Sequence, residues 1–285
     1  ELLKTAYDNN VNYMFEASVG GGIPVIRPLH QDLTANHIMR IAGILNGTTN
    51  YILHQMFTNG ESFENALSDA QAKGYAEKNP AADIEGHDAC RKIAILASLA
   101  SGAAIDYRDI NTEGIVNITL DDVKYAEQLN CVIKLIGYAK FLDNGTVYSI
   151  VSPMLVPDSN LLSGVHDVYN AIMVTGNCVG DLMFYGAGAG KLPTASAVVA
   201  DIVDCVRHKD RPKKLGWGQA KENVMASKDD VEFAYFIRTS SSKDEVKSIF
   251  GEVKFLDGND TAFVTEKLGG SQIEEKLAKL DSVKA

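Results

Sequence analysis

The chain has 285 residues, of which 46% are hydrophobic and 22% are charged, enough to bury the cores of about two globular domains. Its net charge of −10 argues against a nucleic-acid or membrane-surface partner, and no apolar run approaches the ~20 residues needed to span a bilayer. The four cysteines are far apart and the six histidines show no ligand spacing, so we expect reduced thiols and no transition-metal site. With no signal peptide visible, a cytoplasmic protein is expected.

The first 24 residues combine a helical pattern with a glycine loop. Residues 1–10 have the pattern of an amphipathic helix but begin with Glu rather than Met, which predicts that upstream sequence has been lost. Val11–Ala17 has the composition of a strand. In Ser18–Pro24, three consecutive glycines precede a proline, so this stretch is neither helix nor regular strand. It either presents backbone groups to a ligand or is a tight connection between domains.

The next stretch is a predicted strand, turn and helix. Ile38–Leu45 is rich in Ile and predicts a strand, and Asn46-Gly47-Thr48-Thr49-Asn50 then opens a helix over Tyr51–Phe57. Such a helix start presents backbone N–H groups to an anionic ligand, or it is simply capped by its first Asn or first Thr. A second amphipathic helix is predicted over Ser62–Lys73.

Ionisable residues and glycines crowd Gly74–Lys92, and an apolar helical run, Ile93–Ser101, follows at once. A helix beginning near residue 83 or 86 places Asp88 and Lys92 four residues apart on one face. Three further carboxylates lie in the preceding loop, free to converge there: Glu77, Asp83 and Glu85. The alternative is an ordinary helix start, with acidic residues at the positive end of the dipole and a surface ion pair.

The middle of the chain predicts a sheet. A short helix over Leu120–Leu129 precedes strands over Ile133–Phe141 and Val147–Val156, joined at a hairpin turn by Asp143-Asn144-Gly145. A second hairpin joins strands over 170–175 and 178–185 across Gly176-Asn177. The absence of strict βα alternation predicts an α+β fold, a mixed sheet with helices on one face.

The last part of the chain begins with a glycine run, Tyr185–Ala195, whose spacing fits neither phosphate-binding fingerprint. A helix is predicted from Thr194 to Arg207, then a polar linker over 207–223. The remaining residues predict a βαββα module: strands over 231–238, 252–255 and 261–266 and helices over 243–250 and 271–280.

Several of these segments carry family motifs. Gly-Tyr-Ala-Glu at 74–77, Asp83, and Gly-His-Asp-Ala-Cys-Arg-Lys at 86–92 resemble the signature segment of homoserine dehydrogenase, and Gly-Ile-Leu-Asn-Gly-Thr-Thr-Asn-Tyr-Ile at 43–52 resembles a second motif of that family. The resemblance implies substrate contacts from Glu77, Asp83, Asp88, Thr48 and Tyr75. It implies that Lys92 is catalytic, with Asp88 positioning Lys92 or a water.

The same resemblance implies further sites. Glu-Ala-Ser-Val-Gly-Gly-Gly-Ile-Pro at 16–24 is similar to the family segment that holds a monovalent cation, sodium or potassium, mainly through backbone carbonyls. The implied ligands are Glu16, Val19, Gly21 and Ile23. In the glycine run, Gly190 is the implied contact to NAD or NADP. The Gly-x-Gly-x-x-Gly fingerprint of a dinucleotide domain does not occur in these 285 residues.

The implied organisation is a homoserine dehydrogenase that lacks most of its dinucleotide domain. Residues 1–18 and 186–208 are the expected remnant of the Rossmann-type domain, 19–185 the substrate-binding, catalytic and dimerisation domain, 209–230 a linker, and 231–285 an ACT-like module. That module is shorter than usual and lacks the Gly-Val-Leu turn, so binding of a feedback amino acid stays open.

The implied activity is the NAD(P)-dependent interconversion of L-homoserine and L-aspartate 4-semialdehyde by a homodimer or higher homo-oligomer. Two alternatives from other classes are a non-catalytic substrate and dimerisation fragment, and an amino-acid-sensing protein. A dehydrogenase acting on another aldehyde or amino acid is the alternative within the same class.

Overall fold

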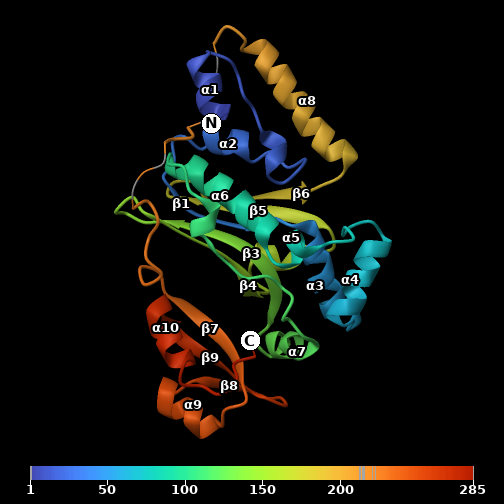
Figure 1. Cartoon of the computed structure of the whole chain (residues 1–285), viewed down its shortest axis with the longest axis vertical. Helices are drawn as coiled ribbons and strands as arrows, with labels where there is room; N and C mark the ends of the chain where they lie inside the picture. The colour runs from blue at the N-terminus through green and yellow to red at the C-terminus, as the bar shows by residue number, and fades with distance from the viewer. Residues whose placement is uncertain (1, 212, 214–215, 220, 222, 285) are drawn as a thin grey trace.

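The computed structural model describes residues 2–211, 213, 216–219, 221 and 223–284. It contains a six-stranded mixed sheet with helices packed on it, and a three-stranded sheet with its own helices toward the C-terminus (Figure 1). The predicted α+β class is confirmed. Within the described residues, no helix is long and apolar enough to cross a bilayer.

The helices and strands follow one another in mixed order along the chain. The helices are α1 (Leu2–Asp8), α2 (Ile26–His30), α3 (Gly47–Asn59), α4 (Phe63–Ala72), α5 (Ala81–Ile84), α6 (His87–Ser101), α7 (Leu120–Gln128), α8 (Lys191–Arg207), α9 (Lys243–Phe250) and α10 (Gly270–Leu277). The strands are β1 (Ile38–Ile44), β2 (Asn111–Thr112), β3 (Cys131–Phe141), β4 (Val147–Pro157), β5 (Tyr169–Gly176), β6 (Gly180–Ala187), β7 (Phe233–Thr239), β8 (Lys254–Leu256) and β9 (Thr261–Leu268). Short 3₁₀ helices are η1 (Glu16–Ser18), η2 (Tyr107–Asp109) and η3 (Leu161–Gly164).

The large sheet has the strand order β2-β4-β3-β1-β5-β6, antiparallel except for the β2–β4 pair. The predicted turn at Asp143-Asn144-Gly145 is confirmed, since the Leu142 amide donates to Thr146 and the Gly145 amide donates to Leu142. Because β1 lies between β3 and β5, it ends in the middle of the sheet. The helix that follows it, α3, therefore starts at a central position, where several connections converge.

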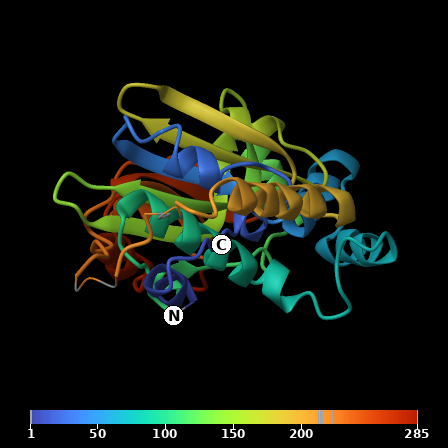
Figure 2. The ribbon, with the colours of Figure 1, turned by 90° about the horizontal axis from the view of Figure 1, so that it is seen from above.

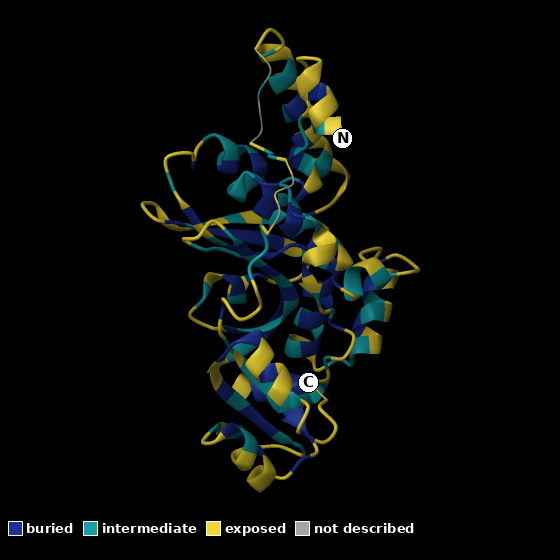
Figure 3. Ribbon diagram, turned by 60° about the vertical axis from the view of Figure 1, so that its left-hand side comes forward, coloured by how far each residue is buried: buried dark blue, intermediate teal, exposed yellow. Residues whose placement is uncertain are grey.

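The larger core lies between this sheet and helices α3 and α6. It includes Ile41 and Leu135 from the sheet, Ile52 from α3 and Ile93 from α6, all nearly inaccessible to solvent. Seen from above, strands and the helices α5 and α6 separate into two layers (Figure 2), and buried residues concentrate where the layers meet (Figure 3). A smaller cluster on the opposite face of the sheet packs under the η3 segment.

The C-terminal module has the predicted βαββα order, with β9 between β7 and β8. It packs on α7 through a small apolar cluster around Tyr125, and polar contacts surround this cluster. Arg238 on β7 is buried against the Asp122 carboxylate (3.2 Å) and lies 3.6 Å from Asp260. Gln128 and Asp257 exchange hydrogen bonds through the Gln128 amide and the Asp257 backbone.

One predicted strand is wrong. Val11–Ala17 forms no strand, and its last residues begin a 3₁₀ turn instead. A segment with strand composition forms a strand only where a neighbouring strand supplies backbone hydrogen bonds, and no described strand pairs with this segment. The short helix α2, which contains Pro28, and the two-residue strand β2 were not predicted.

Other differences concern boundaries. Helix α3 begins at Gly47 rather than Tyr51, because Asn46 accepts a hydrogen bond from the Thr49 amide and caps it. Helix α8 begins at Lys191 rather than Thr194, and the β5–β6 turn covers 177–179. Part of the predicted 207–223 linker (residues 212, 214, 215, 220 and 222) lies outside the described residues, as does Glu1 of the predicted first helix.

Candidate active site

The first turn of α3 contacts several segments that are distant in sequence. The Asn46 side chain contacts the loop and helix of residues 83–88, and the Thr48 hydroxyl donates to the Tyr75 carbonyl oxygen (2.6 Å). The Asn50 amide donates to backbone carbonyls at 165, 167 and 169. A Cβ on Gly47 would lie 2.6 Å from the Val168 carbonyl oxygen, so only glycine fits this close approach.

Four side chains form a connected polar cluster beside this turn. Asn46 Nδ2 donates to Asp83 Oδ1 (2.7 Å) and to Asp88 Oδ2 (2.9 Å). Lys92 Nζ donates to the same Asp88 oxygen (2.7 Å) and to the carbonyl oxygen of Leu45 (3.0 Å). The Lys92 side chain is 19% exposed, so its ammonium is held inside the cluster and retains limited access from outside. The predicted residues Asp83, Asp88 and Lys92 therefore lie together.

The two aspartates have different surroundings. Asp88 is ion-paired with Lys92, whereas Asp83 takes part in none of the ion pairs of the described residues. Burial raises the pKa of the Asp83 carboxyl, and repulsion from Asp88 and Glu77 adds to this rise, while the Asn46 hydrogen bond and the Lys92 charge oppose it. Asp83 is thus a half-buried carboxylate that can pair with a cationic group of a ligand or accept a hydrogen bond from its hydroxyl.

The other predicted substrate residues lie at the margin of the cluster. Glu77 is exposed, and it is near enough to Asp83 to raise the pKa of that carboxyl. Tyr75 is 44% exposed and its ring packs edge-on against Tyr51 (centroids 5.1 Å apart). Because the Thr48 hydroxyl donates to the Tyr75 carbonyl, Thr48 secures the 74–77 turn beside α3.

The glycine loop at 20–22 packs against the glycine run at 186–190. A Cβ on Gly21 would lie 2.4 Å from the Gly188 carbonyl oxygen, and the Gly22 amide donates to the Ala187 carbonyl oxygen (3.2 Å). Gly188 in turn packs on the side chain of Asn170, whose Oδ1 also approaches Gly47. One buried amide side chain therefore separates the glycine run from the first turn of α3.

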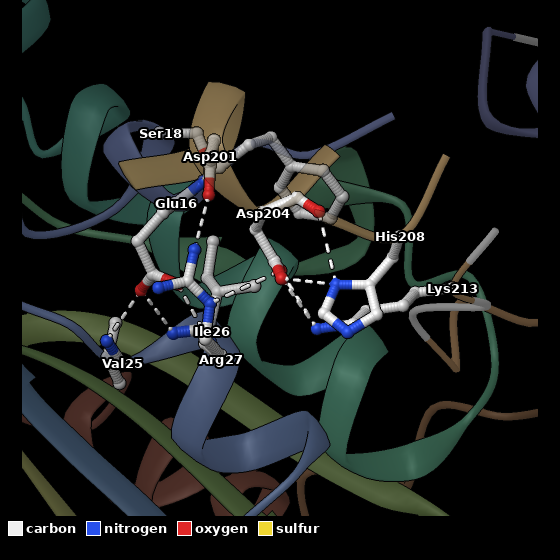
Figure 4. A network of polar contacts seen from close by, with 10 residues as sticks. Glu16, Ser18, Val25, Ile26, Arg27, Asp201, Asp204, His208 and Lys213 are labelled. Carbon is white, nitrogen blue, oxygen red and sulfur yellow. Dashed lines mark hydrogen bonds and ion pairs between the residues drawn. The ribbon is translucent and has the colours of Figure 1, made fainter. Parts of the chain in front are cut away.

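Glu16 has a clear structural role. Its buried carboxylate accepts hydrogen bonds from the backbone amides of Val25, Ile26 and Arg27 at 2.7 to 2.9 Å, so it caps α2 (Figure 4). The predicted cation site relies mainly on backbone carbonyls, and this carboxylate is already engaged by the amides at the start of α2. The other predicted ligands, Val19, Gly21 and Ile23, lie in the same loop, and Gly20 and Gly21 have positive φ angles of 72° and 55°.

Helix α8 is held against this loop by charged side chains (Figure 4). Asp201 accepts from the Glu16 backbone amide (2.8 Å) and from the Arg27 guanidinium (2.7 Å). One turn later, Asp204 accepts two hydrogen bonds from Lys213 Nζ (both 2.9 Å). The network fixes the position of α8, at whose start Gly190 is the N-cap with a φ of 115°.

Asn46 is a residue of this cluster that was not predicted. The sequence indicates it only as a helix cap, and that interpretation is correct for its side-chain oxygen. The sequence signal for its place in the cluster is weak and consists of an Asn between a central strand and a helix start. Nothing local indicates that its amide nitrogen faces carboxylates 37 and 42 residues away.

Comparison with known proteins identifies the family. The sequence profile of homoserine dehydrogenase matches residues 24–203, which include the whole polar cluster. The chain belongs to the homoserine dehydrogenase family. A curated homoserine dehydrogenase from Neisseria gonorrhoeae is 39% identical over 287 residues, a match that covers 98% of this chain. The chain spans 65% of the length of that relative.

Solved structures of homoserine dehydrogenases have the same fold. The enzyme from Thiobacillus denitrificans superposes with a TM-score of 0.91 at 36% identity, covering 99% of this chain and 70% of that one. A mutant of a hyperthermophilic archaeal homoserine dehydrogenase, solved in complex with NADPH, gives a TM-score of 0.62 at 29% identity over 72% of this chain and 59% of that one. The homoserine dehydrogenase family assignment therefore has both sequence and structural support.

Proposed function

We propose that the whole protein interconverts L-homoserine and L-aspartate 4-semialdehyde with NAD or NADP, as a homoserine dehydrogenase of threonine, methionine and isoleucine biosynthesis. The observation that carries this proposal is the Asn46–Asp83–Asp88–Lys92 cluster, because it combines a carboxylate outside any described ion pair with an oriented ammonium. Family membership supports the reaction. The NADPH in the archaeal structure supports the class of cofactor.

In this proposal Lys92 handles the proton of the reacting oxygen. When the alcohol is oxidised, its carbon loses a hydride to the nicotinamide and its oxygen loses a proton to a base; the reverse reaction adds both. Lys92 Nζ donates to Asp88 and to the Leu45 carbonyl, which orient it and leave a third N–H direction for the oxygen of the substrate. As a group held at hydrogen-bonding distance, it polarises that oxygen or transfers its proton.

The carboxylates account for recognition of an amino acid. Asp83 lacks a cationic partner in the described ion pairs, so the ammonium or hydroxyl of the substrate is a suitable partner for it. Glu77 adds negative charge at the exposed margin. We place Thr48 and Tyr75 beside the substrate, where the hydrogen bond between them keeps the 74–77 turn close to α3.

We further propose that the glycine run binds the nicotinamide cofactor through Gly190, and that the loop of Glu16, Val19, Gly21 and Ile23 holds sodium or potassium by backbone carbonyls. The chain's own atoms leave no space for a side chain at Gly21 or Gly188, and this close packing brings the two glycine segments together. Oxygen ligands suit such hard cations. Contact between the two glycine segments would link cation and cofactor binding.

The domain interpretation extends this proposal. We assign 1–18 and 186–208 to a Rossmann-type dinucleotide domain, 19–185 to the substrate domain, 209–230 to a linker and 231–285 to an ACT-like module. Supporting the first assignment, α8 exposes apolar side chains that another domain could cover: Leu192, Val198, Val199, Ile202, Val203 and Val206. We propose a homodimer through the sheet of the substrate domain, and a cytoplasmic location consistent with four free thiols.

The test is substitution of Lys92 in the whole protein. Lys92→Ala should lower kcat by roughly 10²- to 10⁴-fold, the usual contribution of a general acid or base, with the dissociation constant of the dinucleotide nearly unchanged. The matched control is Lys124→Ala on α7, because this lysine also pairs with an aspartate but its side chain is 67% exposed and lies outside the cluster. Near-normal turnover of Lys92→Ala would remove Lys92 from the mechanism.

A further inference from the structure

Asn46 uses both ends of its amide in the cluster. Its Oδ1 accepts a hydrogen bond from the Thr49 amide (2.9 Å), and this contact fixes which way the amide plane faces. Its Nδ2 then has two hydrogens, and the two acceptors are Asp83 Oδ1 and Asp88 Oδ2. Asn46 is 6% exposed, so water competes little for these donors.

The two carboxylates that share this donor would otherwise repel each other. Like charges within ~4–6 Å disfavour ionisation, and Asp88 is among the groups that raise the pKa of Asp83. Lys92 neutralises Asp88, but the hydrogen bond to Asp83 comes from a neutral amide. A hydrogen bond from a neutral donor favours the ionised form of Asp83 and holds the carboxylate in place, without cancelling the charge that a cationic ligand would bind.

We propose that Asn46 is a positioning residue: it separates the tasks of the two aspartates by holding Asp88 on Lys92 and holding Asp83 open toward the substrate. This inference rests on the proposed function, because it assigns Asp83 to a substrate group and Lys92 to the reacting oxygen. Asn46 acts only through these residues. Its helix-capping role is separate, since that role uses Oδ1 and the bridge uses Nδ2.

The separation of the two roles allows a sharp test. Ser and Asp are N-caps about as good as Asn, so Asn46→Ser and Asn46→Asp keep the cap of α3. Serine lacks the pair of N–H donors, and aspartate replaces them with a third negative charge. Ser62→Ala is the matched control, because Ser62 caps α4 through the Asn65 amide and lies outside the cluster. Circular dichroism verifies that each variant is folded.

The first measurement is the titration of the Asp83 carboxyl by carbon-13 NMR in the 285-residue chain. Asn46→Ser should raise the pKa of Asp83 by roughly one unit, and Asn46→Asp by more, since hydrogen-bond loss and added repulsion act in the same direction. The Ser62→Ala control should leave this titration unchanged. An Asp83 titration that stays at its wild-type position in both Asn46 variants overturns the positioning role, whatever the chain binds.

The second measurement is calorimetric titration with L-homoserine at several pH values. Both Asn46 variants should bind about tenfold more weakly at pH values below the pKa of Asp83, with the acid limb of the binding profile moved to higher pH. Equal profiles in the variants and the wild type contradict the positioning role. If the wild-type chain fails to bind L-homoserine while Asp83 still shifts in the variants, the positioning of Asp83 stands and the substrate assignment of the proposed function fails.

Discussion

Lys134 is a buried cation whose cost should be visible in the pH dependence of stability. It lies on β3, is 3% exposed, and donates to Asn50 Oδ1 (2.9 Å) and the Val165 carbonyl oxygen (2.6 Å), both neutral acceptors. Burial lowers the pKa of Lys134 from 10.5 to about 8, and Asp167 opposes this only partly. Two acceptors match the two N–H bonds of a neutral amine, so folding makes the neutral form of Lys134 easier to reach than it is in the unfolded chain.

The sign of the effect follows from proton linkage. Between pH 8 and 10.5 the unfolded chain keeps the proton on Lys134 while the folded chain gives it up, so the free energy of unfolding rises with pH in this window. Below pH 8 both states hold the proton, and the folded state bears the full cost of the buried ammonium. A shift of this size corresponds to about 3 kcal/mol in all, of which about 2.5 kcal/mol is relieved between about pH 7 and pH 10.

The perturbation is Lys134→Met, assayed by urea unfolding with circular dichroism at about pH 7 and pH 10. The free energy of unfolding of the wild type, relative to the variant, should increase by about 2 to 3 kcal/mol over this interval. Lys134→Arg is the control, because a guanidinium keeps its proton at both pH values and cannot relieve the cost. Parallel pH curves for the wild type and Lys134→Met would refute the reasoning.

Three further predictions concern the substrate carboxylate, the glycine run and the C-terminal module. Asp83→Asn should weaken L-homoserine binding by about tenfold or more. In the wild type, binding should strengthen as the pH rises through the raised pKa of Asp83. Calorimetry that finds neither effect contradicts the role of Asp83 in binding the substrate. Gly188→Ala would place a Cβ 2.1 Å from the Asn170 side chain and should cost about 1–3 kcal/mol of unfolding free energy, whereas Gly164→Ala, which meets nothing within 4 Å, should cost much less. Arg238→Leu leaves the buried Asp122 carboxylate unpaired and should lower the free energy of unfolding by about 3–5 kcal/mol, measured by thermal unfolding. The double variant Arg238→Leu with Asp122→Asn should recover much of this stability, and no recovery would contradict the pairing.

The amino-acid sequence by itself determined the features that depend on near neighbours. The helical pattern of 243–250 and the Asp-Asn-Gly hairpin were predicted at their observed positions, because side-chain periodicity and turn chemistry act over a few residues. The Asp88–Lys92 pair was also predicted, since a spacing of four places both residues on one helix face. The motifs around these residues were enough to indicate the family.

Only the tertiary structure decided which distant groups meet. Val11–Ala17 has strand composition but no strand partner among the described strands, and Glu16, predicted as a cation ligand, has its carboxylate engaged in capping α2. Asn46 reaches Asp83 and Asp88, and Lys134 is buried beneath the first turn of α3, because β1 ends in the middle of the sheet. The physical reason is that strand pairing, desolvation and charge repulsion depend on residues brought together by folding, and local sequence carries no record of those distances.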